Sequence, residues 1–228
     1  MIGNMAPEDS WQLEKLGKFS ASEIYKLLSQ PKDKAARERG DMSDTANKYV
    51  HECVAEILTG TIRYMDSIFA IEWGNTHEPD AIERLKEEYP NIEYFGNANK
   101  RFFLLRRFAG GSPDAVDFPL KKVFEIKCPE DPENHVVNML LRDEYDFKAV
   151  HNDYWCQLQM NMMCVAKQSG FEFMESQGLF VSYCPLMLEE GNKIKKITVS
   201  PDANFAQALN VALNKAENYL VECIEKLC

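Results

Sequence analysis

The stretch between about residue 92 and residue 127 constrains the fold more than any other part of the chain. Its segments IEYF, RFFLL, AVDF and KVFEIK are short, rich in aromatic and β-branched residues, and separated by Gly, Asn and Pro. These features are typical of strands, so we expect an antiparallel or mixed sheet in the middle of the chain. Helical patterns flank the stretch on both sides. The sequence therefore predicts an α+β (α/β) protein whose central sheet is flanked by helices.

Local signals place the helices and the remaining strands. A capping box, Ser20 with Glu23 three residues later, opens a predicted helix that Pro31 stops. Ser200 is the expected N-cap of the last helix, with Pro201 in its first position. Further helices are expected at 44–59, at 78–89 with Glu78 near the start, at 134–142 and at 152–167, and further strands at 178–184 and 193–200.

The organisation of the chain is simple. Its 228 residues contain no repeat, low-complexity tract or Gly/Ser-rich linker, so we expect one domain over residues 1–228. The start, MIGNMAPEDSWQLEKL, lacks the basic and apolar parts of a signal peptide, and no run approaches roughly 18 apolar residues. The expected location is the cytoplasm, without membrane attachment. The seven cysteines form no CxxC pair, which disfavours a disulfide framework and a zinc ribbon, and the late ones are too scattered for an iron–sulfur cluster.

The formal net charge of −10 argues against a generic nucleic-acid-coating protein. The basic residues are bunched, however, near Lys15 and Lys18 and then within 31–40, 100–107 and 121–122. The stretch 31–40 taken alone is more simply a solvated face. The two later clusters flank an acidic motif, so the sequence allows a positive groove on an acidic protein.

The acidic motif lies in SPDAVDFPLKKVFEIKCP, residues 112–129. Asp114 stands at the end of one expected strand, and Glu125, Ile126 and Lys127 lie on another. Alternation along a strand turns Glu125 and Lys127 to one face and Ile126 to the other. A carboxylate and an ammonium on one face of a half-buried strand are unusual and need a reason.

Phosphodiester hydrolysis is such a reason. Asp114 and Glu125 carry the hard oxygen ligands that hold Mg²⁺, and a bound metal lowers the pKa of its water. A lysine beside the metal can orient that water and neutralise charge on the phosphate, and Lys127 fits this role. Glu-x-Lys is also common on exposed strands as an ion pair. These three residues alone therefore leave catalysis and surface ion pairing equally open.

The residues around the motif resemble a known group of nucleases. The order PD, spacer, E-x-K is that of the PD-(D/E)XK nuclease superfamily, and the closer resemblance is to the lambda exonuclease family, also called the YqaJ-like viral recombinases. Four stretches agree with that family in order: GKFSASEI at 17–24, EWGNTHEPDA at 72–81, GGSPDAVDFPLKKVFEIKCP at 110–129 and YWCQLQMNMM at 154–163. The resemblance implies a restriction-endonuclease-like core with a central mixed sheet flanked by helices.

The resemblance also implies roles for individual residues. Lys127 would be the catalytic lysine, and Gln157 would help to position the water or the scissile phosphate. Mg²⁺ is the expected cofactor, with two ions bound and Mn²⁺ as a substitute. Its ligands would be three carboxylates and one backbone carbonyl, those of Glu78, Asp114, Glu125 and Ile126. His77, next to Glu78, is expected to be no ligand, because adjacent helix positions point about 100° apart.

A pocket for a 5′-phosphate is the third implied feature. By position, its residues would be Lys15, Ser22 and Ser112. The chain departs from the family here, because Lys15 stands where an arginine is usual and lacks the planar fork that suits a phosphate. A weaker preference for 5′-phosphorylated ends follows.

Taken together, the resemblance implies a Mg²⁺-dependent exodeoxyribonuclease. It would digest one strand of linear duplex DNA from 5′ to 3′ and leave a 3′ single-stranded tail for a single-strand annealing protein. A homotrimeric ring, phage or prophage origin and action in the bacterial cytoplasm belong to the same expectation. Three alternatives remain: an endonuclease on the same core, a catalytically inactive DNA-binding subunit, and a structural protein whose motif is coincidental.

Overall fold

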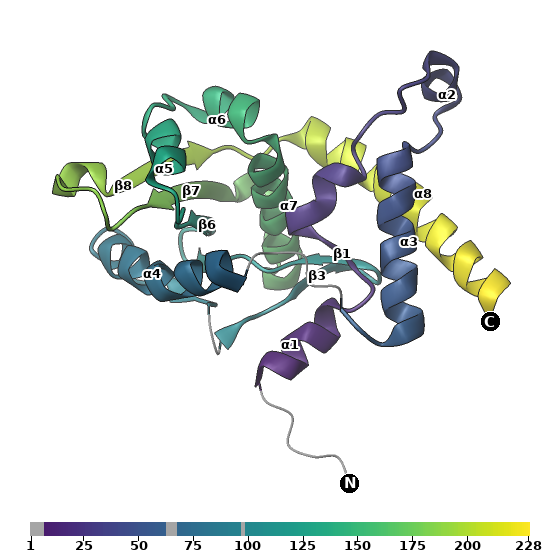
Figure 1. Cartoon of the computed structure of the whole chain (residues 1–228), viewed down its shortest axis with the longest axis horizontal. Helices are drawn as coiled ribbons and strands as arrows, with labels where there is room; N and C mark the ends of the chain where they lie inside the picture. Colours follow the sequence, from purple (N-terminus) through teal and green to yellow (C-terminus); the bar gives the residue numbers. More distant parts are fainter. Residues whose placement is uncertain (1–6, 63–67, 97–98) are drawn as a thin grey trace, which may run out of the picture.

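The computed structural model describes residues 7–62, 68–96 and 99–228, so the first six residues of the segment inspected for a signal peptide lie outside it (Figure 1). Its α-helices are α1 (Pro7–Lys15), α2 (Lys34–Arg39), α3 (Asp44–Thr59), α4 (Ile68–Lys86), α5 (Pro132–Met139), α6 (Glu144–Val150), α7 (Asn152–Ser169) and α8 (Ala203–Leu227). Short 3₁₀ segments are η1 (Ala21–Lys26), η3 (Phe173–Glu175) and η4 (Glu190–Asn192). No helix in this part of the chain is both long enough and apolar enough to cross a membrane.

The strands form two sheets. The larger has the order β2 (Glu93–Tyr94), β5 (Ala115–Asp117), β6 (Lys122–Lys127), β7 (Gln177–Tyr183), β8 (Ile194–Val199). It is mixed, since β6 and β7 run parallel whereas the other neighbours are antiparallel. The smaller sheet has the order β1 (Phe19–Ser20), β4 (Ala109–Gly111), β3 (Phe103–Arg106). The predicted α+β class, with a central mixed sheet flanked by helices, is confirmed.

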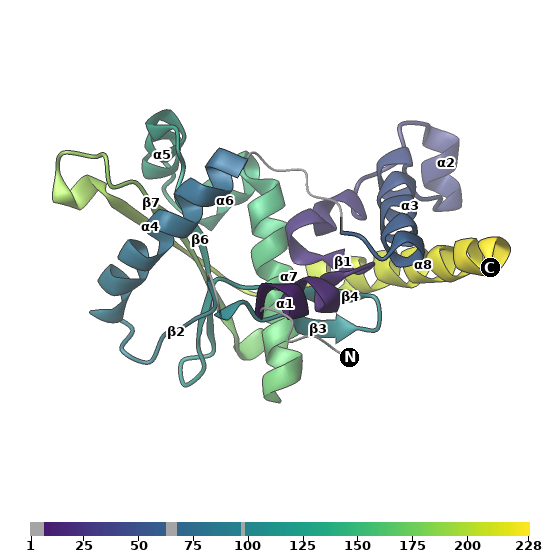
Figure 2. The same cartoon turned by 60° about the horizontal axis from the view of Figure 1, so that its bottom comes forward.

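Helix α7 stands in the middle of the molecule, with α4 and β6–β8 on one side and α3 and α8 on the other (Figures 1 and 2). Successive side chains of β6 point to opposite faces of the sheet and so pack into two different hydrophobic cores. Val123 belongs to the core that includes α7, α3 and α8, whereas Phe124 and Ile126 pack with α4 residues such as Ile82. Glu125 and Lys127 therefore lie on one face, as the alternation predicted, and this face is the one that meets α7.

Three local expectations were wrong. The segment after Ser20 is 3₁₀ and not α, and the Ser20 side chain makes no cap hydrogen bond, because its hydroxyl pairs with that of Ser22. Helix α4 begins ten residues earlier than expected (78 − 68 = 10) and continues through Pro79, so Glu78 lies inside it. Helix α8 is capped by Asp202 and not by Ser200, since the Asp202 carboxylate accepts from the N–H groups of Asn204 and Phe205.

The basic stretch 31–40 forms α2, a helix in which no residue is buried. Asp33 caps its start and Gly40 ends it in the left-handed conformation. Its cations have close partners: Lys34 pairs with Glu38, and Arg39 pairs with Asp41. This arrangement agrees with the interpretation of the stretch as a solvated face.

Candidate active site

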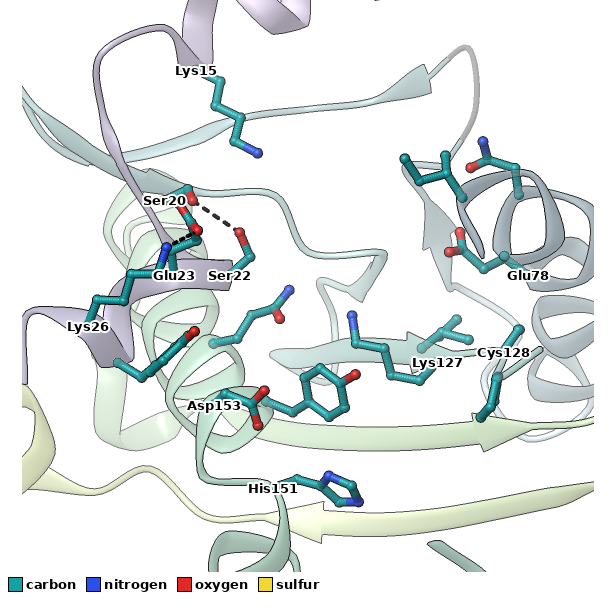
Figure 3. Close-up of a pocket in the computed structure, with 18 of the residues that line it drawn as sticks. Lys15, Ser20, Ser22, Glu23, Lys26, Glu78, Lys127, Cys128, His151 and Asp153 are labelled. Carbon is teal, nitrogen blue, oxygen red and sulfur yellow. Dashed lines mark hydrogen bonds and ion pairs between the residues drawn. The ribbon is translucent and has the colours of Figure 1, made fainter. Parts of the chain in front are cut away.

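A cavity of about 960 Å³ opens between α4, η1, α7 and the end of β6. Figure 3 shows Glu78 on one side of it, Lys15 and Ser22 on the other, and Lys127 between them. The cavity wall contains six of the nine residues singled out from the sequence, namely Lys15, Ser22, Glu78, Ile126, Lys127 and Gln157. Three residues are not part of the wall. Asp114 and Glu125 form hydrogen bonds with the wall residues Ile126 and Lys127, and Ser112 accepts a hydrogen bond from Trp11.

Asp114 lies immediately before β5 and caps the edge of β6. Its carboxylate accepts a hydrogen bond of 2.5 Å from the backbone N–H of Ile126. The backbone of Asp114 still belongs to the sheet, because its N–H donates to the carbonyl of Phe124. Since N–H and C=O of one strand residue point to the same edge, the carbonyl of Ile126 also lies on the edge that Asp114 occupies. The Ile126 side chain is buried among residues of α4 and the sheet. It is therefore the backbone of Ile126 that faces the cavity.

Glu125 is fully buried and both of its carboxylate oxygens have partners. Oε1 accepts from Lys127 Nζ at 2.6 Å, and Oε2 accepts from the side-chain amide of Asn161 on α7 at 3.1 Å. The Lys127 side chain remains 28% exposed, so its ammonium reaches the cavity while it holds the carboxylate. Asn161 can approach this closely because Gly111 has no side chain: a Cβ there would lie 2.1 Å from Asn161 Oδ1.

Glu78 approaches the same place from α4. Its Oε2 accepts from the hydroxyl of Tyr94 on β2 at 3.0 Å. Burial, together with the nearby Asp114 carboxylate, raises the pKa of Glu78 to about 7. The three carboxylates thus lie within electrostatic reach of one another although they come from α4, β6 and the start of β5.

The electrostatics of the site favour a bound cation. Burial raises the pKa of Glu125 to about 8, with Lys127 opposing the shift and Asp114 adding to it. Burial likewise raises the pKa of Asp114, again opposed by Lys127. For Lys127 burial lowers the pKa, but the carboxylates of Glu125 and Asp114 outweigh it and hold the pKa above its usual value. Lys100 also acts on Glu78 and Asp114, but two ammonium groups do not balance three partly desolvated carboxylates. A divalent cation would neutralise the excess negative potential.

Lys15 and Ser22 line the far side of the cavity, where the Ser22 hydroxyl pairs with that of Ser20 at 3.0 Å. Ser112 lies apart from the cavity wall and accepts from the indole N–H of Trp11 at 2.9 Å. Trp11 also gathers two cations, since Lys15 Nζ and Lys100 Nζ lie 5.3 and 4.8 Å from its ring centroid. The indole therefore contacts two of the three predicted phosphate-binding residues, Lys15 and Ser112, and the third, Ser22, lies apart from it.

Comparison with known proteins places this site in a family. The model of the YqaJ-like viral recombinase domain matches residues 10–171, which is more than half of the chain. The chain belongs to that family. The motif-based prediction of the YqaJ-like family is thereby confirmed, and with it a nuclease domain that serves recombination. A search of curated proteins finds no significant match.

Solved structures support the fold of the YqaJ-like domain. The alkaline exonuclease LHK-Exo from Laribacter hongkongensis is 20% identical, with a TM-score of 0.68 over 96% of this chain and 97% of the other. Its complex with dAMP gives 21% identity and a TM-score of 0.71 over 96% and 95%. A phage-related exonuclease from Haemophilus somnus 129PT is 20% identical, with a TM-score of 0.73 over 92% and 96%. At these identities the likeness concerns the fold.

The residues of this YqaJ-like domain suit a hard divalent cation, although no three Asp, Glu, His or Cys side chains within 7–62, 68–96 and 99–228 form a ready-made ligand cluster. Mg²⁺ commonly takes only one or two carboxylates and fills its other positions with water and substrate phosphate. Asp114 and Glu125 would provide that number, and the Ile126 carbonyl lies on the same edge of β6 as Asp114. Glu78 adds a carboxylate across the cavity. The His77 ring packs on Trp73, with 4.3 Å between the ring centroids.

The structure adds residues to the site that sequence reasoning missed. Tyr154 and Asn161 flank Gln157 on α7, where Tyr154 lies under Lys127 and Asn161 holds Glu125. Their positions are three residues before and four after Gln157, so all three share one helix face. This spacing was readable from the sequence, but only the fold shows that the face meets β6. Tyr94, Lys100 and Trp11 had no comparable signal.

Proposed function

We propose that this protein is a Mg²⁺-dependent exodeoxyribonuclease that digests one strand of linear duplex DNA from 5′ to 3′. The observation that carries the proposal is that Asp114 and Glu125 form hydrogen bonds with Ile126 and Lys127, two residues in the wall of a cavity whose far side carries Lys15 and Ser22. We call the end near Glu78 the acidic end of the cavity and the end near Lys15 and Lys26 the basic end, although the carboxylate of Glu23 also lines the latter. A metal-assisted hydrolysis at one end and an anion-binding contact at the other would fit a chain end of DNA.

The acidic end would bind the cofactor. Two Mg²⁺ ions would bind there, and Mn²⁺ could replace them. Their ligands would be the carboxylates of Asp114, Glu125 and Glu78 and the backbone carbonyl of Ile126. When bound, the metal supplies Lewis acidity and lowers the pKa of water at the scissile phosphate. The chain's own part is to fix these oxygens: the Ile126 N–H orients Asp114, Asn161 orients Glu125, and Tyr94 orients Glu78.

The positive charge of Lys127 would stabilise the transition state of the hydrolysis. Its ammonium is 2.6 Å from Glu125 Oε1 and partly exposed to the cavity, so it can donate to an attacking water or to a phosphate oxygen. Gln157 lines the cavity beside it and would position the water or the phosphate through its amide. Neither residue needs to change its charge for these roles.

The basic end would recognise the 5′-phosphate. Lys15 and Ser22 line the cavity there. Lys100 supplies a second ammonium, because its Nζ, like that of Lys15, lies near the Trp11 ring. The Ser112 hydroxyl accepts from the Trp11 indole, so Ser112 would hold Trp11 in place beside the two lysines. Two lysines provide charge without a bidentate fork, so the preference for 5′-phosphorylated ends should be modest.

Membership of a recombinase family and the fold of two exonucleases support this assignment. The product would be a 3′ single-stranded tail, handed to a single-strand annealing protein during phage-type recombination in the bacterial cytoplasm. We further propose that residues 1–228 form one domain and that the active protein is a homotrimeric ring around DNA.

The central test is a digestion of end-labelled linear duplex in Mg²⁺ by wild type and by Lys127→Ala. The wild type should release mononucleotides from 5′ ends. Lys127→Ala should lose about 10²–10³-fold in rate, the usual effect of removing one transition-state donor. It should keep its circular dichroism but melt at a lower temperature, because the buried Glu125 loses its ion partner. Lys34→Ala on the exposed α2 is the matched control and should cleave like the wild type. Unchanged cleavage by a folded Lys127→Ala protein would refute the proposed site.

Two further arms separate the alternatives. A closed circular plasmid has no ends, so an exonuclease leaves it intact, whereas an endonuclease on the same core would cut it. A catalytically inactive subunit would bind the linear duplex and release no nucleotide with Mg²⁺ or Mn²⁺. Label at the 3′ end instead of the 5′ end reports the polarity.

A further inference from the structure

A buried polar network lies directly beside Lys127. In the parallel pairing of β6 and β7, Lys127 is the register partner of Ser182, so both side chains leave the sheet on the same face. The Ser182 side chain is fully buried, and its hydroxyl contacts Asn138 Nδ2 at 2.9 Å and His135 Nδ1 at 2.8 Å. Ser182 therefore couples β7 to α5 at the level of Lys127.

The direction of each hydrogen bond in this network can be worked out. His135 Nε2 contacts the carbonyl of Asn192 at 2.8 Å, and a carbonyl only accepts, so a neutral His135 carries its proton on Nε2. Its Nδ1 then accepts from the Ser182 hydroxyl. The Asn138 amide nitrogen donates to Ser182, which leaves Asn138 Oδ1 to accept from His151 Nε2 at 2.7 Å. Each of these contacts has one donor and one acceptor, so the network fixes the His151 ring from the backbone of η4.

The fixed His151 ring in turn supports Tyr154. The two rings stack with centroids 5.4 Å apart at 25°, and Phe180 packs at 6.1 Å and 19° from Tyr154. Burial lowers the pKa of His151, so this ring is neutral and can stack without adding charge. Lys127 Nζ lies 4.9 Å from the centroid of the Tyr154 ring, within the range of a cation–π contact. Figure 3 shows His151 and Lys127 on the same side of the cavity.

We propose that Tyr154 is a positioning residue for Lys127 and that the network of His135, Ser182, Asn138 and His151 holds its ring in place. Glu125 binds the ammonium from one direction and the ring supports it from another. Two contacts restrict a side chain that otherwise has four rotatable bonds, so the ammonium is held ready before the substrate arrives. This inference rests on the catalytic role of Lys127 proposed above.

The sharpest test varies the ring without varying its shape. Tyr154→Phe keeps the ring, and replacing that Phe with mono-, di- and trifluorophenylalanine withdraws electron density from its face and weakens a cation–π contact stepwise. If Tyr154 positions Lys127, kcat falls with each added fluorine, by about 10-fold over the series, while KM for linear duplex stays within about 2-fold. A flat kcat across the series would overturn the proposal.

Removal of the ring gives an independent check. Tyr154→Leu should lower kcat by about 10- to 100-fold and leave duplex binding in Ca²⁺ unchanged, whereas Tyr154→Phe should restore most of the rate. Tyr145→Leu, at a 77% exposed position on α6, is the control for loss of a tyrosine. A loss of duplex binding equal to the loss of rate would mean that Tyr154 contacts DNA, which contradicts the positioning role.

The design separates this inference from the proposed function. If the wild type does not degrade DNA, the proposed function fails first. If the wild type degrades DNA and the fluorinated series has constant kcat, only the role of Tyr154 fails. The melting temperature of Tyr154→Leu shows whether this variant folds. If it does not fold, the fluorinated series alone tests the role of Tyr154, because its side chains differ little in size.

Discussion

At the level of single residues, the site depends on how each carboxylate is satisfied. Glu125 is completely buried, and a buried charge is costly unless it is paired. Lys127 and Asn161 occupy its two oxygens, whereas Asp114 is held by a backbone N–H. These partners fix the orientation of the carboxylates in advance. A metal ligand whose position is set by the fold loses less entropy on binding.

Lys15 stands where the sequence resemblance implies an arginine, so Lys15→Arg tests the proposed phosphate contact. Lys15→Arg restores a planar fork that can bind a phosphate with two parallel hydrogen bonds. We expect the ratio of cleavage rates on 5′-phosphorylated and 5′-hydroxyl ends to rise by about 3- to 10-fold. Rapid-quench digestion of the two substrates measures the ratio. Lys34→Arg is the control, and an unchanged ratio in Lys15→Arg would remove Lys15 from the phosphate site.

At the level of elements, the approach of α7 to the two sheets determines the chemistry. One face of α7 presents Tyr154, Gln157 and Asn161 to the site, while Gln159 on the same helix holds the segment before α8 through Ser200 and Asp202. The helix therefore serves as a structural support and as part of the cavity wall. Its close contact with β4 is possible only beside a residue without a side chain.

That contact gives a prediction for Gly111 on β4. In Gly111→Ala the new methyl group would lie 2.1 Å from Asn161 Oδ1, so Asn161 must shift and its bond to Glu125 weakens. We expect a loss of about 1–3 kcal/mol in the free energy of unfolding, the usual range for overpacking, together with a lower kcat. Gly191→Ala is the matched control because nothing lies within 4 Å of its added Cβ. Urea titration and steady-state kinetics measure both effects, and equal behaviour of the two variants would contradict the packing argument.

At the level of the whole molecule, the acidic site lowers stability unless it is neutralised. Glu125 and Glu78 have pKa values of about 8 and about 7 in the folded protein, above those of an unfolded chain. The folded state therefore binds their protons more tightly. This contribution to stability is complete below the unfolded pKa of about 4.3 and is lost as the pH rises through 7 to 8.

The melting temperature of the metal-free protein should accordingly fall between about pH 5 and pH 9. Added Mg²⁺ should raise it more at pH 8.5 than at pH 6, because deprotonated carboxylates bind the cation more tightly. Differential scanning calorimetry with EDTA or with Mg²⁺ provides the comparison. Glu125→Gln removes one titrating group and should flatten the curve. A Mg²⁺ effect that is larger at pH 6 would contradict the assignment of these carboxylates as ligands.

The net charge of −10 is a property of the whole molecule that bears on DNA binding. A ring that encloses its substrate needs few strong phosphate contacts, so an acidic exterior and a basic interior are compatible. Size-exclusion chromatography with light scattering should give about three times the chain mass of 26.2 kDa at micromolar concentration. A mass equal to one chain, with and without linear duplex, would exclude the trimer.

The sequence alone determined the fold class, the positions of the main strands along the chain and the shared face of Glu125 and Lys127, because these depend on local periodicity. It also determined the family, since four motifs kept their order along the chain. Only the tertiary structure decided which partners hold those residues. Packing of α7 brings Tyr154 and Asn161 to Lys127 and Glu125, and packing of β2 brings Tyr94 to Glu78. Packing of α1 brings Trp11 to Ser112. Contacts of this kind depend on how elements pack, which periodicity does not encode.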